Sequence, residues 1–293
     1  MDFHHQYVDS NGISLHAVQA GPENGPLLIL LHGFPEFWYG WRHQIAFLAQ
    51  AGYRVWAPDQ RGYNLSQKPR GITAYNLDEL TADVVGLIDA ANREKAIVVG
   101  HDWGGAVAWW LANKHPERLE KLIVVNAPHH AAMKRYLGRN LNQWLRSLYI
   151  LFFQIPWLPE TLLRAGNWRA LARLMQASGR SGAFSRTALD VYRRAWSQPG
   201  AITGMLNWYR AIRQVRPQRL PGPRITVPTL LIWGARDVAL SRELAPLSIE
   251  LCDDGRLVLI EEATHWVMHE QPQRVNRLIH DYILEQHNLE QIP

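Results

Sequence analysis

Asp102 is the side chain of this sequence that is best placed to act as a nucleophile. It lies at the centre of the segment Gly-His-Asp-Trp-Gly-Gly at residues 100–105, between an apolar run at 96–99 and a helical stretch at 106–110. Small residues two positions before and after the centre allow a sharp turn that presents the central side chain. A carboxylate there can displace a leaving group at an sp³ carbon and form an ester that water cleaves. Aspartate is also a favoured helix N-cap, so the turn alone leaves a capping role open.

A second turn offers the donors that such chemistry requires. The segment His-Gly-Phe-Pro at residues 32–35 follows the apolar run 27–31, so it comes at the end of an earlier predicted strand. We expect the backbone N–H groups of Phe34 and Trp103 to hold the oxyanion that develops when the ester is hydrolysed. Phe34, Trp103 and Trp208 are further expected to contact the substrate, although packing explains the tryptophans equally well.

His265 is the predicted general base, since ester hydrolysis needs a group that deprotonates water near neutral pH. It follows the strand-like run 257–260, at the carboxyl edge of the sheet where α/β sites form. Asp237, at the end of the preceding strand-like run 229–233, is expected to orient the imidazole. The order nucleophile, acid, histidine is the order found in hydrolases that use this turn. Four other histidines are assigned to turns or to the hinge of an inserted segment: His32, His101, His129 and His130.

The elements that must position these groups predict an α/β fold. Asn11-Gly12 between two short strands favours a hairpin, and continuous apolar runs are typical of parallel strands buried on both faces. Helical stretches separate them, which indicates a mostly parallel, twisted sheet flanked by helices. The strand-like segments are 7–9, 13–18, 27–31, 54–57, 96–99, 122–125, 229–233 and 257–260, and the helical ones are 77–91, 106–114 and a last helix from Pro272.

The sheet pattern is interrupted by an insertion of different character. Residues 130–227 are rich in Arg, Leu, Trp and Tyr, contain no apolar strand run and are predicted to form several short helices. We expect this segment to be a helical lid, or cap. The predicted organisation is therefore a core in two parts, residues 1–129 and 228–293, with the lid at 130–227.

Composition limits the remaining functions. The net charge of +5 comes from arginines scattered between apolar residues, and a nucleic-acid surface would be more clustered. Cys252 is the single cysteine, which excludes an internal disulfide and leaves no cysteine cluster for a metal. The start of the chain lacks the pattern of a signal peptide, and no apolar run approaches the roughly 18 residues of a membrane span. We expect a cytoplasmic monomer or homodimer without metal or cofactor, acting on a small molecule.

The sequence resembles the α/β-hydrolase superfamily over nearly its whole length, and in particular the epoxide hydrolases of the soluble type. Residues 32–42 and 100–105 are similar to two segments of that family, which dehalogenases share. In the lid, residues 206–210 and, more loosely, 149–154 resemble the segments that carry two ring-opening tyrosines. The resemblance implies that Tyr209 and Tyr149 protonate the epoxide oxygen, and phenols can do so as an alkoxide forms. The substrate would be a small epoxide.

Three alternatives remain at the level of sequence. A haloalkane or haloacid dehalogenase would use the same acid, base and nucleophile, with indole N–H groups binding the halide, but the tyrosine pair argues against it. A non-catalytic ligand-binding homologue belongs to another class, since folds host unrelated functions. Its discriminating observation would be an ester that forms and is not released. A serine-type esterase is disfavoured because aspartate occupies the turn.

Overall fold

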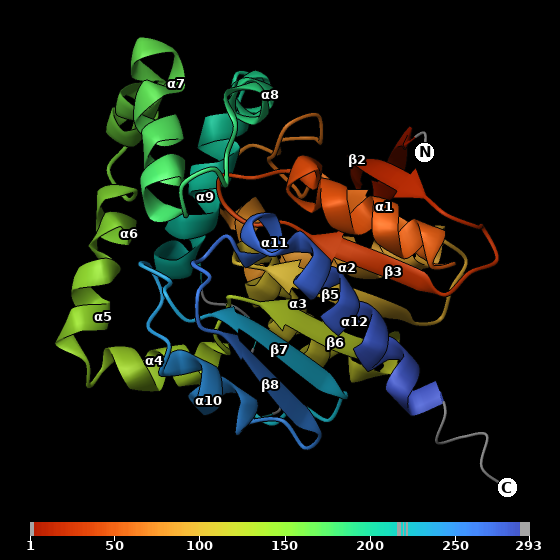
Figure 1. Cartoon of the computed structure of the whole chain (residues 1–293). Coiled ribbons are helices and arrows are strands. Elements are labelled where there is room, and N and C mark those ends of the chain that lie inside the picture. Colours follow the sequence, from red (N-terminus) through yellow and green to blue (C-terminus); the bar gives the residue numbers. More distant parts are fainter. Residues whose placement is uncertain (1–2, 216–217, 219, 221, 288–293) are drawn as a thin grey trace, which may run out of the picture.

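An eight-stranded sheet forms the centre of the molecule in the computed structural model, which describes residues 3–215, 218, 220 and 222–287 (Figure 1). The strand order is β1-β2-β4-β3-β5-β6-β7-β8. β1 and β2 pair antiparallel, β2 pairs antiparallel with β4, and all further pairs are parallel. The predicted mostly parallel sheet is confirmed. The strands are β1 (His4–Ser10), β2 (Ile13–Ala20), β3 (Leu27–Leu31), β4 (Arg54–Pro58), β5 (Ala96–His101), β6 (Leu119–Val125), β7 (Thr229–Gly234) and β8 (Gly255–Ile260).

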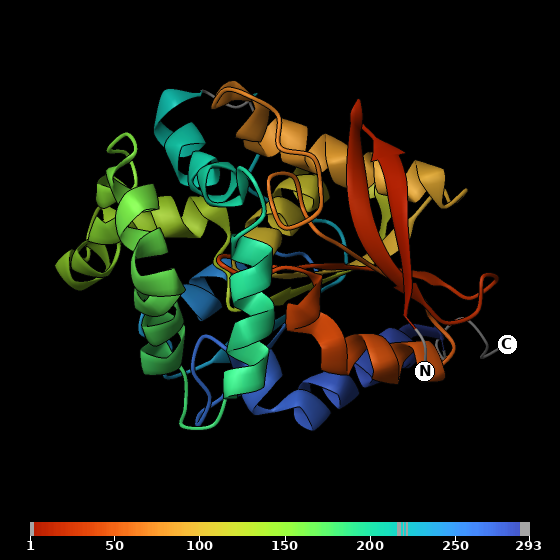
Figure 2. The same cartoon turned by 90° about the horizontal axis from the view of Figure 1, so that it is seen from above.

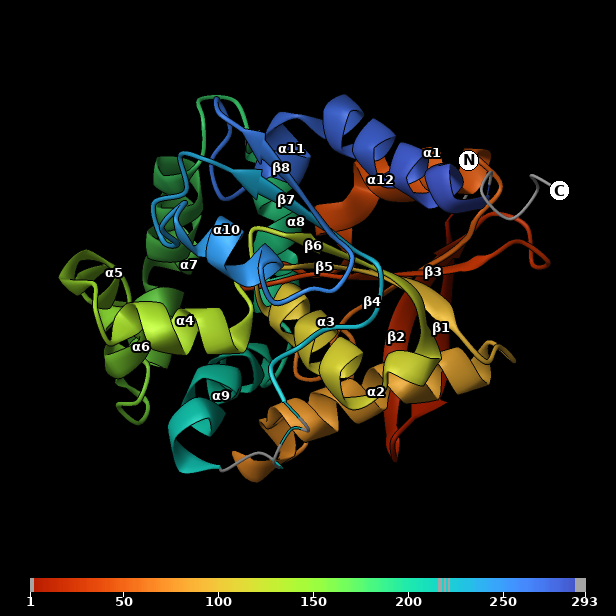
Figure 3. The same ribbon diagram turned by 90° about the horizontal axis from the view of Figure 1, so that it is seen from below.

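Helices cover both faces of this sheet, as the view from below shows (Figure 3). Alternate residues of β3 belong to two separate apolar clusters: Leu28 and Leu30 to one, Leu27 and Leu31 to the other. Such burial on both faces explains the uninterrupted apolar runs. One face is covered by α1 (Arg42–Gln50), α11 (Val267–Glu270) and α12 (Pro272–His287), and the other by α2 (Leu77–Ala90), α3 (Trp103–Lys114) and α10 (Leu244–Ile249). Short 3₁₀ helices are η1 (Trp38–Trp41), η2 (Thr73–Tyr75) and η3 (Pro116–Arg118).

Six helices lie between β6 and β7 in the sequence and form a layer beside the sheet (Figure 2). They are α4 (His130–Leu137), α5 (Leu141–Arg146), α6 (Leu148–Phe152), α7 (Leu158–Ser178), α8 (Arg186–Trp196) and α9 (Ala201–Gln214). α7 is longer than predicted, but residues 165–168 leave helical geometry and divide it. Residues 216, 217, 219 and 221 of the predicted lid lie outside the described residues. No helix in the described part of the chain is long and apolar enough to cross a membrane.

Two hydrogen bonds from α8 connect the helical layer to the core. The Tyr192 hydroxyl donates to Glu36 Oε1 at 2.5 Å, and the Trp196 indole N–H donates to the carbonyl of Pro35 at 2.6 Å. Both hydrogen bonds are buried, and one apolar cluster continues from the sheet into α7, α8 and α9. The insertion is therefore packed against the loop that follows β3.

Candidate active site

Asp102 lies at the turn between β5 and α3 with φ +50° and ψ −118°. Such a conformation is costly for a non-glycine residue, and it is found where the surrounding structure holds a functional side chain in place. The turn needs its small neighbours: a Cβ on Gly104 would lie 2.2 Å from the carbonyl oxygen of Leu31, and one on Gly33 would lie 2.4 Å from Asp102 Cβ. Asp102 occupies the N-cap position of α3, but its side chain makes no capping hydrogen bond. The carboxylate is thus directed elsewhere.

The backbone of the loop after β3 contacts this carboxylate. The N–H of Phe34 donates to Asp102 Oδ1 at 2.8 Å. Trp103, the first residue of α3, places its own N–H at the unpaired end of that helix. The two N–H groups predicted as a pair therefore belong to loops that meet at Asp102.

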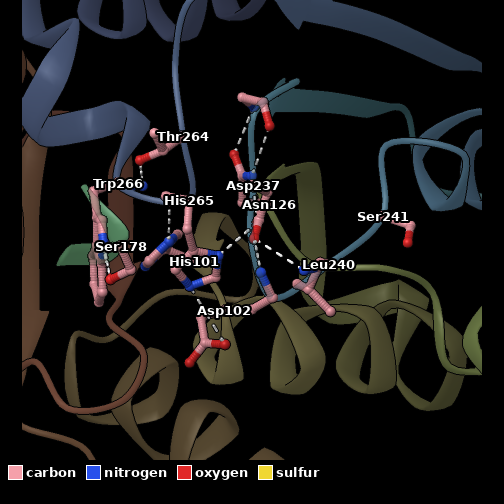
Figure 4. A network of polar contacts seen from close by, with 12 residues as sticks. His101, Asp102, Asn126, Ser178, Asp237, Leu240, Ser241, Thr264, His265 and Trp266 are labelled. Atoms are coloured by element: carbon pink, nitrogen blue, oxygen red, sulfur yellow. Dashed lines mark hydrogen bonds and ion pairs between the residues drawn. The ribbon is translucent and has the colours of Figure 1, made fainter. Parts of the chain in front are cut away.

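His265 and Asp237 lie on the other side of Asp102 (Figure 4). His265 Nδ1 contacts Asp237 Oδ2 at 2.7 Å, and its Nε2 lies 3.7 Å from Asp102 Oδ2. Asp237 is held by further donors: Asn126 Nδ2 at 2.8 Å to Oδ2, and the backbone N–H groups of Ala239 and Leu240 to Oδ1. The three residues come from loops after β5, β7 and β8 and converge at one edge of the sheet.

The charges of this group favour a cationic imidazole in the free protein. Burial by itself disfavours the charged form, but the charge and hydrogen bond of Asp237, together with Asp102, raise the pKa of His265 to about 9. Burial likewise disfavours the charged Asp237, and His265 more than offsets it, so the pKa of Asp237 is lowered.

Two tyrosines from the insertion face this group. Tyr209 on α9 is buried, and its ring lies 5.8 Å from that of Tyr149, centroid to centroid. Burial first, then the neighbouring Tyr149 and the charge of Asp102, raise the pKa of Tyr209 well above 10. Burial and Asp102 also raise the pKa of Tyr149, although part of its ring remains exposed. Both phenols therefore keep their protons at neutral pH.

A cavity of about 400 Å³ is lined by four of these five side chains, all but Asp237. Its walls are mostly apolar, which suits a small molecule with few polar groups. It is lined by Phe34, Pro35, Asp102, Arg146, Tyr149, Phe152, Phe153, Leu163, Leu174, Met175, Ser178, Tyr209, Val238, Ala239, His265 and Trp266. Of the predicted substrate contacts, the structure thus places Phe34 at the cavity.

Trp103 and Trp208 do not line this cavity. They contact one another edge to face and line a separate hollow of about 110 Å³ together with residues of α9. The Trp208 indole N–H donates to the carbonyl of Arg61 at 3.0 Å, so it is already paired. The Trp103 ring packs against that of Tyr209, with 5.0 Å between the ring centroids, and the substrate contacts of Trp103 and Trp208 stay a prediction. Their position depends on packing between α3 and the lid helix α9, which the sequence could not show.

The other histidines make contacts within the scaffold. His32 Nε2 accepts the N–H of Gln60 at 3.0 Å, and His101 Nε2 lies 2.9 Å from the carbonyl oxygen of His265. His129 and His130 begin the insertion, and burial lowers their pKa values to about 3 and 4.

Glu36 is a buried acid that sequence reasoning did not single out. Its carboxylate accepts the Tyr192 hydroxyl and contacts His269 Nε2 at 2.7 Å, with His101 Nδ1 at 3.4 Å. Burial raises its pKa, but His269 and His101 more than compensate, so the pKa lies well below its ordinary value. A charged residue directly after the Phe-Pro turn was a signal, but its partners lie up to 233 residues away in the sequence. In the described part of the chain, no group of three or more His, Cys, Asp or Glu side chains could hold a metal ion.

Comparison with known proteins agrees with this geometry. A family model for the alpha/beta hydrolase fold matches residues 26–272. The chain is 52% identical over 281 residues to the AB hydrolase superfamily protein YfhM of Bacillus subtilis (strain 168), covering 96% of this chain and 98% of that protein. It is 40% identical over 285 residues to Epoxide hydrolase 4 of Homo sapiens, covering 95% and 78%.

Solved structures give the same assignment. An epoxide hydrolase of Bacillus megaterium in complex with an inhibitor has a TM-score of 0.88 and 30% identity to this chain, and the match covers 96% of this chain and 100% of that one. A single-residue mutant of an epoxide hydrolase from the same organism has a TM-score of 0.87 at the same identity and coverage. The chain therefore belongs to the α/β-hydrolase family and, within it, to the epoxide hydrolases.

Proposed function

We propose that this enzyme hydrolyses epoxides to vicinal diols through an ester on Asp102. The observation that carries the proposal is the placement of Tyr149 and Tyr209 on the wall of the cavity that also contains Asp102 and His265. A carboxylate and two protonated phenols around one apolar space can attack a strained carbon and protonate the oxygen that leaves.

The first half of the reaction uses the carboxylate and the phenols. One Asp102 oxygen attacks an epoxide carbon, the carbon–oxygen bond of the ring breaks, and the electron pair goes to the ring oxygen. Tyr209 or Tyr149 transfers its proton to that oxygen, which leaves a hydroxyl on the alkylated enzyme and a phenolate in the lid. The N–H of Phe34, already bonded to Asp102 Oδ1, fixes the direction of the attack.

The second half cleaves the ester. Ester formation removes the charge of Asp102 that helps to stabilise the imidazolium, so His265 gives its proton to the phenolate. The neutral imidazole then takes a proton from water, and the hydroxide adds to the carbonyl carbon of the ester at Asp102. The N–H groups of Phe34 and Trp103 stabilise the oxyanion that forms. Collapse breaks the bond between the carbonyl carbon and the Asp102 oxygen that attacked the epoxide. That oxygen leaves in the diol and takes the proton of the newly formed carboxyl group, so Asp102 is again a carboxylate with one oxygen from water. Asp237 stabilises the imidazolium that results, which is the state of His265 in the free enzyme.

Trapping the ester tests this proposal. Incubation of His265→Gln with a styrene-type epoxide should leave a protein heavier by the mass of the epoxide, with the label on the peptide that contains Asp102. The matched double variant Asp102→Ala/His265→Gln should remain unlabelled. Diol and halide are read separately from the wild type with epoxides and bromoalkanes. Halide release without diol formation would assign the same residues to dehalogenation instead, and a full diol yield from Asp102→Ala would reject the ester.

A further inference from the structure

Several large apolar side chains on α5, α6 and the start of α7 are exposed. α5, α6 and α7 form the outer edge of the molecule in two views (Figures 1 and 2). Leu141 and Trp157 are each 72% exposed, and the neighbouring side chains are also exposed. We call the following set the outer lid face: Leu141, Trp144, Leu145, Leu151, Trp157 and Leu162. Large apolar side chains gathered on one surface mark an interaction site more often than isolated ones do.

The charge of the same segment is strongly positive. Residues 130–214 contain 13 Lys and Arg against 2 Asp and Glu, a net charge of +11, whereas the whole chain carries +5. The rest of the chain therefore carries −6. In the described structure, ion pairs join only Arg193 and Arg210 to acidic partners within the lid. The other eleven basic residues there make no ion pair with a described residue, and those on α4 and α7 are mostly exposed.

A second copy of the chain is a poor occupant for this surface. A symmetric dimer through the outer lid face would bring two segments of +11 together, and such a like-charge juxtaposition is unfavourable. An anionic bilayer supplies the complementary charge, while its interfacial region accepts Trp and Leu side chains. Apolar residues flanked by arginines are the arrangement that interfacial binding requires.

Two residues that line the cavity are also exposed. Leu174 lines the cavity and is 55% exposed, and Tyr149 is likewise both a lining residue and partly exposed. We propose that the outer lid face docks on the surface of an anionic lipid bilayer and thereby turns the mouth of the cavity toward the lipid. Apolar molecules dissolved in the bilayer would then reach the cavity without crossing bulk water. This docking does not depend on the reaction catalysed at Asp102.

Vesicle binding tests the proposal without any activity measurement. The wild type is mixed with vesicles of phosphatidylcholine alone or of equal parts phosphatidylcholine and phosphatidylglycerol, and bound protein is separated by flotation. Binding should require phosphatidylglycerol and should weaken as salt is raised from about 50 to about 500 mM, because salt screens surface charge. Each basic residue near an anionic surface raises the binding constant about fivefold, so Arg139→Gln/Arg173→Gln should bind the anionic vesicles about 25-fold more weakly. Leu141→Ser/Leu145→Ser/Trp157→Ser should lose roughly tenfold or more, since burial of each apolar group is favourable.

Matched variants on the core separate docking from a general effect of charge or polarity. Arg70→Gln/Arg277→Gln removes the same charge from exposed core positions, and Leu284→Ser makes the same apolar-to-polar change on α12. Both should bind vesicles like the wild type, and thermal melting confirms that all variants fold. Equal binding of the lid and core variants, equal binding to neutral and anionic vesicles, or absence of binding would overturn the proposal. So would a dimer in sedimentation that the lid substitutions dissociate.

Discussion

In the proposed mechanism, Tyr149 and Tyr209 distinguish epoxide opening from the other reactions that an aspartate nucleophile can perform. Each Tyr→Phe change removes one hydroxyl and keeps the ring, so the packing of Tyr209 against Phe34 and Trp103 should persist. Loss of a donor directed at developing charge should slow alkylation by on the order of a hundredfold for each variant. Single-turnover quenched-flow measurements with a styrene-type epoxide give this rate.

The double variant Tyr149→Phe/Tyr209→Phe should have almost no epoxide-opening activity. Tyr75→Phe is the matched control, because its hydroxyl donates to the carbonyl of Pro69 outside the cavity. A double variant that alkylates at the wild-type rate would exclude both phenols as proton donors.

The pKa of His265 makes a prediction about stability. A histidine has an ordinary pKa of 6.5, and in the folded protein this one is raised to about 9. A raised pKa stabilises the fold fully below pH 6.5, and this contribution is lost as the pH rises through 9. The free energy of unfolding should thus fall by about 3 kcal/mol between these values, at about 1.36 kcal/mol for each unit. Urea unfolding at about pH 6.5, 7.5 and 9 measures it.

Substitution of His265 by Gln should remove most of that pH dependence. His129→Gln is the control, because the pKa of His129 is lowered to about 3 and the side chain stays neutral throughout this range. The proposed linkage fails if wild type and His265→Gln lose equal stability between pH 6.5 and about 9.

Residues of the site were predictable where their position in the chain determines their place in the sheet. Asp102, Asp237 and His265 each follow an apolar run, and parallel strands bring such positions to one edge. Glu36 was not predictable, because its role depends on His269 and Tyr192, which approach it only in the folded molecule. The surroundings of Trp103 and Trp208 were likewise not predictable, because they too depend on contacts that form only in the folded molecule.

At the scale of elements, the lid helix α5 contacts the loop that contains Asp237. Gln143 is fully buried, and its amide donates to the carbonyl of Ala239 at 2.9 Å and accepts the N–H of Ser241 at 2.8 Å. Arg146 on the same helix donates to the carbonyl of Asp237 at 3.1 Å. These contacts hold the loop whose N–H groups in turn bind the Asp237 carboxylate.

Gln143→Ala should therefore make the position of Asp237 less fixed, although Gln143 does not line the cavity. Two backbone groups would lose their partner, at a cost of about 1–3 kcal/mol in stability. Ester hydrolysis should slow while alkylation is spared, and single-turnover measurements of the two half-reactions separate them. Gln176→Ala, the same change at an exposed position of α7, should alter neither. Equal slowing of both half-reactions by Gln143→Ala would contradict the positioning role.

The core strands and helices that were predicted lie within three residues of their observed bounds, whereas α1, α10, α11 and the bounds of the lid helices were not predicted. Burial on both faces gives β3 and β5 a continuous apolar pattern, and the Asn11-Gly12 turn with φ values of 47° and 71° fixes the hairpin. The lid helices pack partly on one another and partly face outward, so their apolar residues give no single period. The break in α7 at Gly166 to Trp168 arises from left-handed backbone values that only glycine signals in sequence.

At the scale of the whole molecule, core and lid share one apolar cluster and a buried polar contact, so we expect them to unfold together. Tyr192→Phe tests this coupling because it removes the hydroxyl that Glu36 accepts from α8 and leaves a buried carboxylate with one donor fewer. Such a loss should cost about 1–3 kcal/mol. Calorimetry should show a single transition that moves to lower temperature, since no part of the cluster can separate without exposing the rest.

The matched control for this last variant is Tyr136→Phe. It removes a tyrosine hydroxyl that also joins the lid to a carboxylate of the core, Glu243, but in an exposed contact of 3.3 Å. Water can replace that hydrogen bond, so the free energy of unfolding should change by no more than about 0.5 kcal/mol. Hydrogen exchange of Tyr192→Phe should rise together in α8 and in β3, because both are released by the same opening. Exchange that rises in α8 alone, or two calorimetric transitions in the wild type, would show that the lid opens independently of the core.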